Sequence, residues 1–169
     1  MTPLIRQVRL LLLGVWLGAA IFFGAAVAPS LFSVLRAAGL ANANELAGAV
    51  VSRLLAVVNK GGFEIALFLL ITGWFVNRAR SRLAQVAEMI SIAIMAIMTS
   101  INQWVIAARM LDLRWSMGGA LDQVTAADPR RVEFESLHRY SVILMAVALI
   151  AGLVAFILAS RREKQTEMS

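Results

Sequence analysis

The chain contains no cysteine and only one histidine. The lack of cysteine excludes disulfides, thiolate metal sites, cysteine nucleophiles and cysteine-ligated iron–sulfur clusters. One histidine cannot supply both axial ligands of a haem, and it cannot form a metal site without other ligands. A Ser/His/Asp set, a phosphate-binding loop and an HExxH motif are also missing, which disfavours hydrolases and nucleotide-dependent enzymes. We therefore expect no ordinary enzymatic activity, and the sequence assigns no cofactor.

Charge is also scarce, since 15% of the residues are charged and 60% are hydrophobic. A soluble domain of this length could not bury so much apolar surface. The apolar residues form long blocks, and the segments 10–28 and 140–159 carry no charge at all. Blocks of about 18 or more apolar residues are typical of membrane spans. The net charge of +6 comes from basic residues near span ends, where lipid headgroups explain them, so we expect no nucleic-acid partner.

The hydrophobic blocks predict four spans in a single transmembrane domain, at about 10–28, 54–76, 83–108 and 140–159. A short basic hinge joins the second span to the third, so these two spans should be antiparallel neighbours. The residues from 161 to 169 are expected to form a cytoplasmic tail.

The start of the chain resembles a secretory signal peptide, because Arg6 and Arg9 precede an apolar run that ends in Ala26-Val27-Ala28. Pro29 makes a poor scissile bond directly after such a site, so we expect the first helix to remain as a span. If that helix continues beyond Pro29, the proline removes one backbone hydrogen bond. A kink near the membrane face should result.

Two further helical segments are predicted outside the apolar blocks. Asn44 is a candidate N-cap for an amphipathic outer segment that leads into the second span near Leu54. Asp128 followed by Pro129 is a typical helix start and predicts an extension that runs into the fourth span. The fold class is therefore all-α integral membrane, a four-helix transmembrane bundle with an amphipathic outer segment before span two and a helical extension before span four.

Basic residues lie beside the spans at the N-terminus, in the hinge 77–82 and in the tail 161–169. The positive-inside rule predicts that all three segments face the cytoplasm. Both chain ends would then be cytoplasmic, and the location would be a bacterial inner membrane.

Polar residues in the third span are the main functional candidates, because burying such groups in a bilayer is costly. Helical spacing places Glu88, Ser91 and Asn102 on one stripe that faces the bundle. We expect a polar groove between spans three and four, formed by Glu88, Ser91, Asn102, Arg109, Glu135, His138 and Ser141. In the structural alternative, Glu88 pairs with Arg82 and Asn102 bonds a neighbouring helix.

His138 shares a helix face with Glu135 and Ser141, so its imidazole is a candidate for metal binding or proton transfer. We expect it to lie within reach of polar groups of the third span such as Asn102 or Arg109. The alternative role is a capping or interhelical hydrogen bond. Met95 and Met98, one turn apart, could bind monovalent copper through their thioethers, although flexible packing is the more common role of methionine.

Small residues recur at four-residue spacing in the first and fourth spans. Such spacing lets helix backbones approach closely, either within the bundle or between copies of the chain. The residues expected at these contacts are Gly14, Gly18, Gly24 and Gly152.

Several segments together resemble the transmembrane-protein-205-like family, known in bacteria as a membrane domain of unknown function. The matching segments are 15–23, 28–32, the region around Asn102, and Phe134-x-x-Leu-His-x-x-Ser141. The first of them also has a weaker similarity to D-type copper-resistance membrane proteins. The resemblance implies four spans, a membrane location and an occasional association with metal or drug tolerance.

Three functions remain open at this point. The first is a small membrane protein that binds or passes a small solute or metal ion through the polar groove. The second is a structural or assembly subunit that packs against a membrane partner or another copy of itself. The third, a membrane redox protein holding haem or quinone, is disfavoured by the lone histidine.

Overall fold

The computed structural model describes residues 3–40, 42–76, 82–118 and 123–160, and these form helices and connecting turns without a β-strand. The elements in chain order are α1 (Pro3–Phe22), the π-helix η1 (Phe23–Val27), α2 (Ala28–Ala37), α3 (Ala43–Val76), α4 (Arg82–Ile101), the π-helix η2 (Asn102–Ile106), α5 (Ala107–Ser116) and α6 (Pro129–Ser160). The basic hinge at 77–81 and the tail at 161–169 lie outside the described residues.

Four continuous rods are long and apolar enough to cross a membrane: Leu4–Ala37, Ala43–Gly73, Arg82–Ser116 and Pro129–Ser160. The predicted fold class is thereby confirmed, and the protein is an integral membrane protein. At about 1.5 Å per residue, each rod is roughly 45–50 Å long, whereas the hydrocarbon layer is about 30 Å thick. The rods must therefore tilt in the membrane or extend beyond it.

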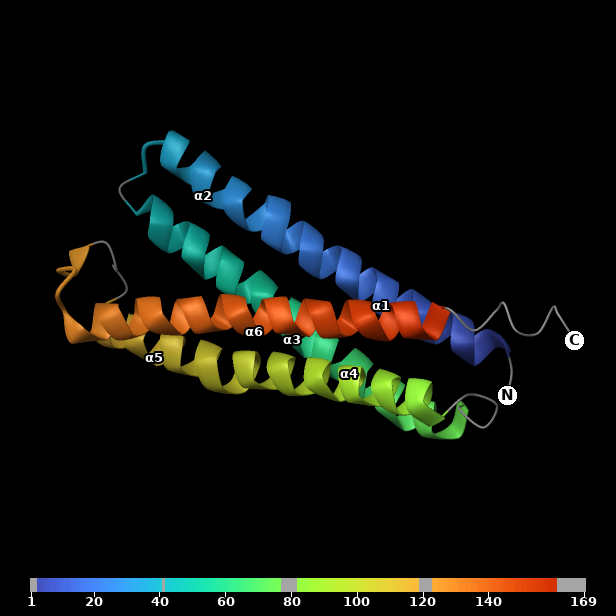
Figure 1. Cartoon of the computed structure of the whole chain (residues 1–169). Helices are drawn as coiled ribbons and strands as arrows, with labels where there is room; N and C mark the ends of the chain where they lie inside the picture. Colours follow the sequence, from blue (N-terminus) through green and yellow to red (C-terminus); the bar gives the residue numbers. More distant parts are fainter. Residues whose placement is uncertain (1–2, 41, 77–81, 119–122, 161–169) are drawn as a thin grey trace, which may run out of the picture.

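The rods alternate in direction (Figure 1), so α1 begins and α6 ends at the same end of the bundle, here called the N-terminal end. The end of α3 and the start of α4 lie there too, and the α2–α3 and α5–α6 connections lie at the opposite end. α4 packs against both α3 and α6, and α1 also packs against α3 and α6. Residues far apart in the sequence therefore meet at the same level of the bundle.

The start of α3 differs in detail from the sequence prediction. The amphipathic outer segment is the first part of one continuous helix that begins at Ala43. Asn44 does not act as the N-cap, because it lies inside the helix and its Oδ1 accepts a hydrogen bond from Arg36 Nε at 2.8 Å. The first turn of the helix is closed by a backbone hydrogen bond, in which the N–H of Leu46 donates to the carbonyl of Asn42. The side chain of Asn44 thus ties α3 to the end of α2.

The predicted extension before the fourth span is present, since α6 runs unbroken from Pro129 to Ser160. Asp128 caps it: its Oδ1 accepts the backbone N–H of Arg130 at 2.8 Å, and its Oδ2 accepts a bond from the Arg130 guanidinium at 2.7 Å. The hydrogen bond from the Arg130 side chain is the largest cause that lowers the pKa of Asp128 from its ordinary value of 3.8 to about 2. The carboxylate form is therefore the one that stabilises this helix start.

The first helix continues past Pro29, which therefore lies inside the first rod, and the helix is irregular just before it. In η1 the N–H of Ala28 donates to the carbonyl of Phe23, one residue farther back than in an α-helix. Pro29 has no N–H to donate, and this wider turn shifts the backbone hydrogen-bond pattern just before it. The rod continues as α2 to Ala37, and Gly39, with φ of 68°, closes it.

The core lies where α1 meets the small-residue faces of α3 and α6. Trp16 is buried, and a Cβ placed on Gly152 would lie 2.9 Å from its ring. A Cβ on Gly62 would lie 2.6 Å from the Trp16 nitrogen. The indole therefore occupies space that two glycines leave open, and the expected close contact at Gly152 is present.

The glycines of the first span differ in how closely side chains of other helices approach them. A Cβ on Gly14 would meet Phe156 at an ordinary 3.6 Å, but Gly18 and Gly24 are exposed, and no atom from another described helix lies within 4 Å of a Cβ added to either. Within this chain, Gly18 and Gly24 do not form the expected close contact, because Trp16 and Leu17 occupy the inner face of α1.

Candidate functional site

A buried ion pair joins α1 to α4 near the N-terminal end of the bundle. Arg9 Nη2 donates to Glu88 Oε1 at 2.9 Å, and Arg9 Nη1 donates to the carbonyl of Leu69 and to Thr72 Oγ1 on α3. The side chains of Arg9 and Glu88 are 4% and 1% exposed. Three rods are thus connected by one guanidinium group.

Local sequence explains how the pair forms. Arg9 lies on the same helix face as the buried residues Leu13 and Trp16, so its side chain starts on the inner side of α1. Gly73 leaves room for it, since a Cβ there would lie 3.3 Å from one guanidinium nitrogen. Arg9 lies six residues after Pro3, about 9 Å along the helix axis. The pair is therefore well inside the bundle and not at its tip.

The partner of Glu88 differs from the alternative considered for it. The sequence suggested Arg82, within two helical turns, but Arg82 is exposed and the ion pair of Glu88 is with Arg9, 79 residues away. Glu88 points into the bundle, where Arg9 from another helix reaches it. Sequence reasoning treated Arg9 solely as a topology signal and missed this role.

A second polar layer lies near the middle of the bundle. Asn102 Nδ2 donates to Asn59 Oδ1 at 3.4 Å, and both side chains are almost completely buried. Trp16 Nε1 donates to the carbonyl of Val58 at 3.0 Å. The hydroxyl of Thr99 donates to the carbonyl of Met95 in its own helix at 2.8 Å. These groups are called here the central polar layer, and the bonds of Asn102 and Trp16 connect α3 with η2 and α1.

Asn102 is also the first residue of η2, and its carbonyl accepts the N–H of Ala107. Single π-helical turns in α-helices occur frequently at functional sites. Asn59 was not among the sequence candidates, although Asn59, Gly62, Ala66, Leu69 and Gly73 follow helical spacing and are all buried. The sequence signal that could have identified Asn59 is that this polar residue begins a helical stripe of apolar and small residues.

The remaining candidates do not converge with Glu88 and Asn102. Arg109 forms an exposed ion pair with Glu133 at 2.8 Å, and Glu135 pairs with Arg131 at 3.1 Å. Ser141 is buried on α6. Some of the predicted groove residues are therefore buried in the bundle, and the others lie on an exposed surface at the end opposite the N-terminal end.

His138 lies on the exposed surface of α6. In the described parts of the chain it forms no hydrogen bond or ion pair. Met95 is fully buried in the apolar core, and Met98 packs against that core. Among the described residues, no three His, Asp or Glu side chains come together as a metal site would require.

A known protein family matches much of the chain. The family described as a domain of unknown function, DUF4149, matches residues 11–117. The chain belongs to the DUF4149 family. No curated protein and no solved structure matches it. These comparisons lend no support to the resemblance to transmembrane-protein-205-like or copper-resistance proteins.

The DUF4149 match includes Asn59, Glu88 and Asn102 and begins two residues after Arg9. It ends before α6, so His138 lies outside it. The buried polar residues of α3 and α4 thus belong to the part of the chain that defines membership.

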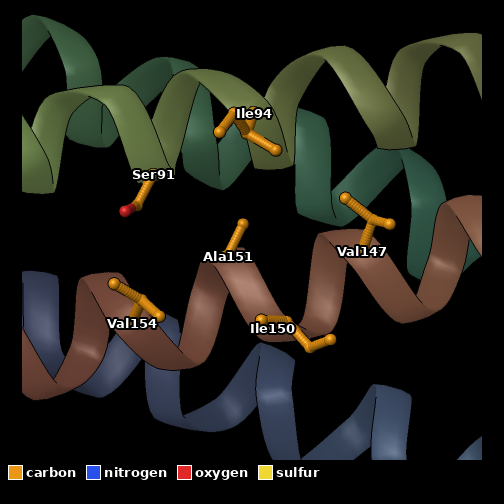
Figure 2. A pocket seen from close by; sticks show the side chains of 6 residues that line it. All are labelled: Ser91, Ile94, Val147, Ile150, Ala151 and Val154. Atoms are coloured by element: carbon orange, nitrogen blue, oxygen red, sulfur yellow. The ribbon is translucent and has the colours of Figure 1, made fainter.

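One groove in this DUF4149 protein lies between α4 and α6, with a volume of about 300 Å³. Figure 2 shows Ser91 and Ala151 facing each other across it. The lining residues are Ser91, Ile94, Val147, Ile150, Ala151 and Val154. The hydroxyl of Ser91 donates to the carbonyl of Ala87 at 2.8 Å. The groove between spans three and four is therefore apolar and not polar as predicted.

Proposed function

We propose that this DUF4149 protein is a structural or assembly subunit of a membrane complex. Its buried polar side chains hold its own helices together, and its apolar outer faces contact lipid and a membrane partner. The observation that carries the proposal is that α4 directs Glu88 to Arg9 of α1, and η2, which continues it, directs Asn102 to Asn59 of α3. These are the polar groups that a solute pathway through the third span would need.

The energetics support a structural use of these groups. Removing one partner from a buried ion pair leaves an uncompensated charge, which is strongly destabilising. A solute that displaced Arg9 from Glu88 would incur that cost and would also separate the guanidinium from Thr72. The groove between α4 and α6 would not replace these polar contacts for the solute, since Ser91 is the one polar residue among the described residues that line it.

The second candidate is binding or passage of a small solute or metal ion. It is favoured by the π-helix η2, which begins at the buried Asn102. An association with metal or drug tolerance, as implied by the transmembrane-protein-205-like resemblance, would belong to this candidate. The exposure of His138 and the core position of Met95 argue against a metal site built from the residues first considered.

We also propose a location in a bacterial inner membrane with both chain ends in the cytoplasm. The even number of spans supports ends on one side, and the basic hinge supports the cytoplasmic side. Because the chain has no cysteine, single cysteines at positions 82 and 123 provide a direct test. An impermeant thiol reagent added to spheroplasts should label position 123 and not position 82, and the reverse pattern would overturn the orientation.

The functional proposal is tested by two measurements on the same protein. Extraction from native membranes into polymer-bounded lipid discs should yield a particle that contains the chain and at least one other polypeptide or copy. Purified protein in liposomes that hold a fluorescent indicator should pass Zn²⁺, Cu⁺ or K⁺ no faster than protein-free liposomes. A single-chain particle, or ion flux that Asn102→Leu abolishes while the chain remains folded, would overturn the proposal.

A further inference from the structure

The central polar layer contains one hydrogen-bond donor and one acceptor that no protein group satisfies. Among the described residues, Asn59 Nδ2 and Asn102 Oδ1 are buried and have no hydrogen-bond partner. Their amides are joined only by the 3.4 Å contact from Asn102 Nδ2 to Asn59 Oδ1. A closed pair of amides would form two bonds of about 2.9–3.0 Å. The two side chains therefore face each other without completing their bonding.

These atoms lie far from the polar ends of the bundle. Asn59 is 16 residues after the start of α3 and 17 before its end, which is about 25 Å from either end. Asn59 is 0% exposed and Asn102 is 1% exposed. Because both side chains are this deeply buried, the missing partner must be enclosed with the two amides.

We infer that one internal water molecule bridges Asn59 Nδ2 and Asn102 Oδ1. The ligand has to accept a hydrogen bond from the first group and donate one to the second, and a neutral molecule with both capacities does so. A metal cation would be repelled by the amide hydrogens of Asn59, and an anion by the oxygen of Asn102. Buried waters in proteins typically occupy sites of this kind, with two to four polar partners.

The chemistry of the site does not depend on which way the amides point. If both amide groups were rotated by 180°, Asn59 would present a free oxygen and Asn102 a free NH₂ group. One donor and one acceptor would still remain, and the same ligand would satisfy them. The requirement for a donor–acceptor molecule thus follows from the pairing of two asparagines and not from one assignment of their atoms.

The site goes beyond the proposed function, because it holds under a structural role and under a solute-binding role alike. Water completes the contact between α3 and α4 where no helix-to-helix bond of ordinary length is formed. It also satisfies the side chain of the residue at which η2 begins. The bundle centre therefore contains a polar tie made jointly by protein and solvent.

The test uses the full-length protein, ¹⁵N-labelled in lipid nanodiscs, and measures magnetisation transfer from water to the side-chain NH₂ groups. The Asn59 and Asn102 resonances should receive magnetisation from a water that exchanges slowly with the bulk. Single substitutions to Leu assign the two resonances, and Ser91→Ala, in the lipid-facing groove, is the control that leaves both signals unchanged. Absence of transfer to both amides in the folded parent would overturn the inference.

A second measurement counts long-lived waters by the frequency dependence of deuteron and ¹⁷O relaxation. Asn59→Leu/Asn102→Leu should hold one fewer long-lived water than the parent, because both polar partners are then apolar. An equal count in a folded double variant would contradict the site. Replacing NaCl with choline chloride should leave both amide resonances in place, and a shift of both would identify a cation instead of water.

Discussion

The two ends of the bundle each carry an arginine–carboxylate pair, and the shortest nitrogen–oxygen distance is nearly the same in both. Arg9 and Glu88 are 2.9 Å apart at the N-terminal end, and Arg109 and Glu133 are 2.8 Å apart at the opposite end. Their burial differs: the first pair is 4% and 1% exposed, whereas the second is 53% and 43% exposed. A short distance therefore does not by itself measure the importance of an ion pair.

The difference between the pairs lies in what remains when one partner is lost. An exposed arginine without its carboxylate is solvated by water and screened by salt, so little stability changes. A buried arginine without its carboxylate remains desolvated and charged. The N-terminal pair also connects three rods, because Arg9 bonds Thr72 of α3. We therefore expect the two ends to respond very differently to the same substitution.

The largest effect is predicted for Glu88→Ala, which should lower the free energy of unfolding by about 3–5 kcal/mol, because it leaves Arg9 buried without its carboxylate. Reversible unfolding by SDS in mixed micelles measures it. Glu133→Ala is the matched control from the exposed pair and should change the unfolding free energy far less. Equal losses of unfolding free energy in the two variants would contradict the expected difference between the two ends of the bundle.

The next effect contrasts two glycines. Gly152→Leu should destabilise the bundle by about 1–3 kcal/mol, because a side chain there overlaps the buried ring of Trp16 and forces the core to shift. Gly18→Leu should leave unfolding of the chain nearly unchanged, since no atom lies within 4 Å of its Cβ position. Both are measured in the same unfolding assay. A larger loss for Gly18→Leu than for Gly152→Leu would contradict the packing described for Trp16.

The smallest effect concerns pH at the start of α6. The pKa of Asp128 is about 2, below its ordinary 3.8. A lowered carboxyl pKa contributes stability that is present above pH about 4 and is lost as the pH falls toward 2. Thermal unfolding followed by circular dichroism between pH 5 and 2 should show a smaller loss for Asp128→Asn than for the parent. Identical pH dependence in the two proteins would mean that the cap does not stabilise the folded state.

The fold was predictable because its signal is contained in single segments. Apolar blocks of span length and the Asp128–Pro129 helix start each act locally, and the structure bears them out. The span expected at 54–76 belongs to a helix that begins at Ala43, since the amphipathic segment and the apolar block have compatible periodicity.

The candidate site was predictable only on one helix. Helical spacing placed Glu88, Ser91 and Asn102 on an inner stripe, and all three are buried. It did not reveal their partners, because Arg9 and Asn59 are brought near them only by the packing of separate rods. His138 shows the opposite failure. Phe134 and Ser141 on the same helix are buried, but the buried face of α6 is narrow and His138 falls outside it.

The central claim, that the polar groups of the third span hold the bundle together, is tested most directly by a double-mutant cycle on the buried ion pair. The unfolding free energy is measured for the parent, Arg9→Leu, Glu88→Leu and the double variant. The account predicts that each single change costs about 3–5 kcal/mol and that the double change costs clearly less than their sum, since an apolar pair leaves no unpaired charge. Losses that simply add would contradict the claim, because Arg9 and Glu88 would then contribute to stability independently.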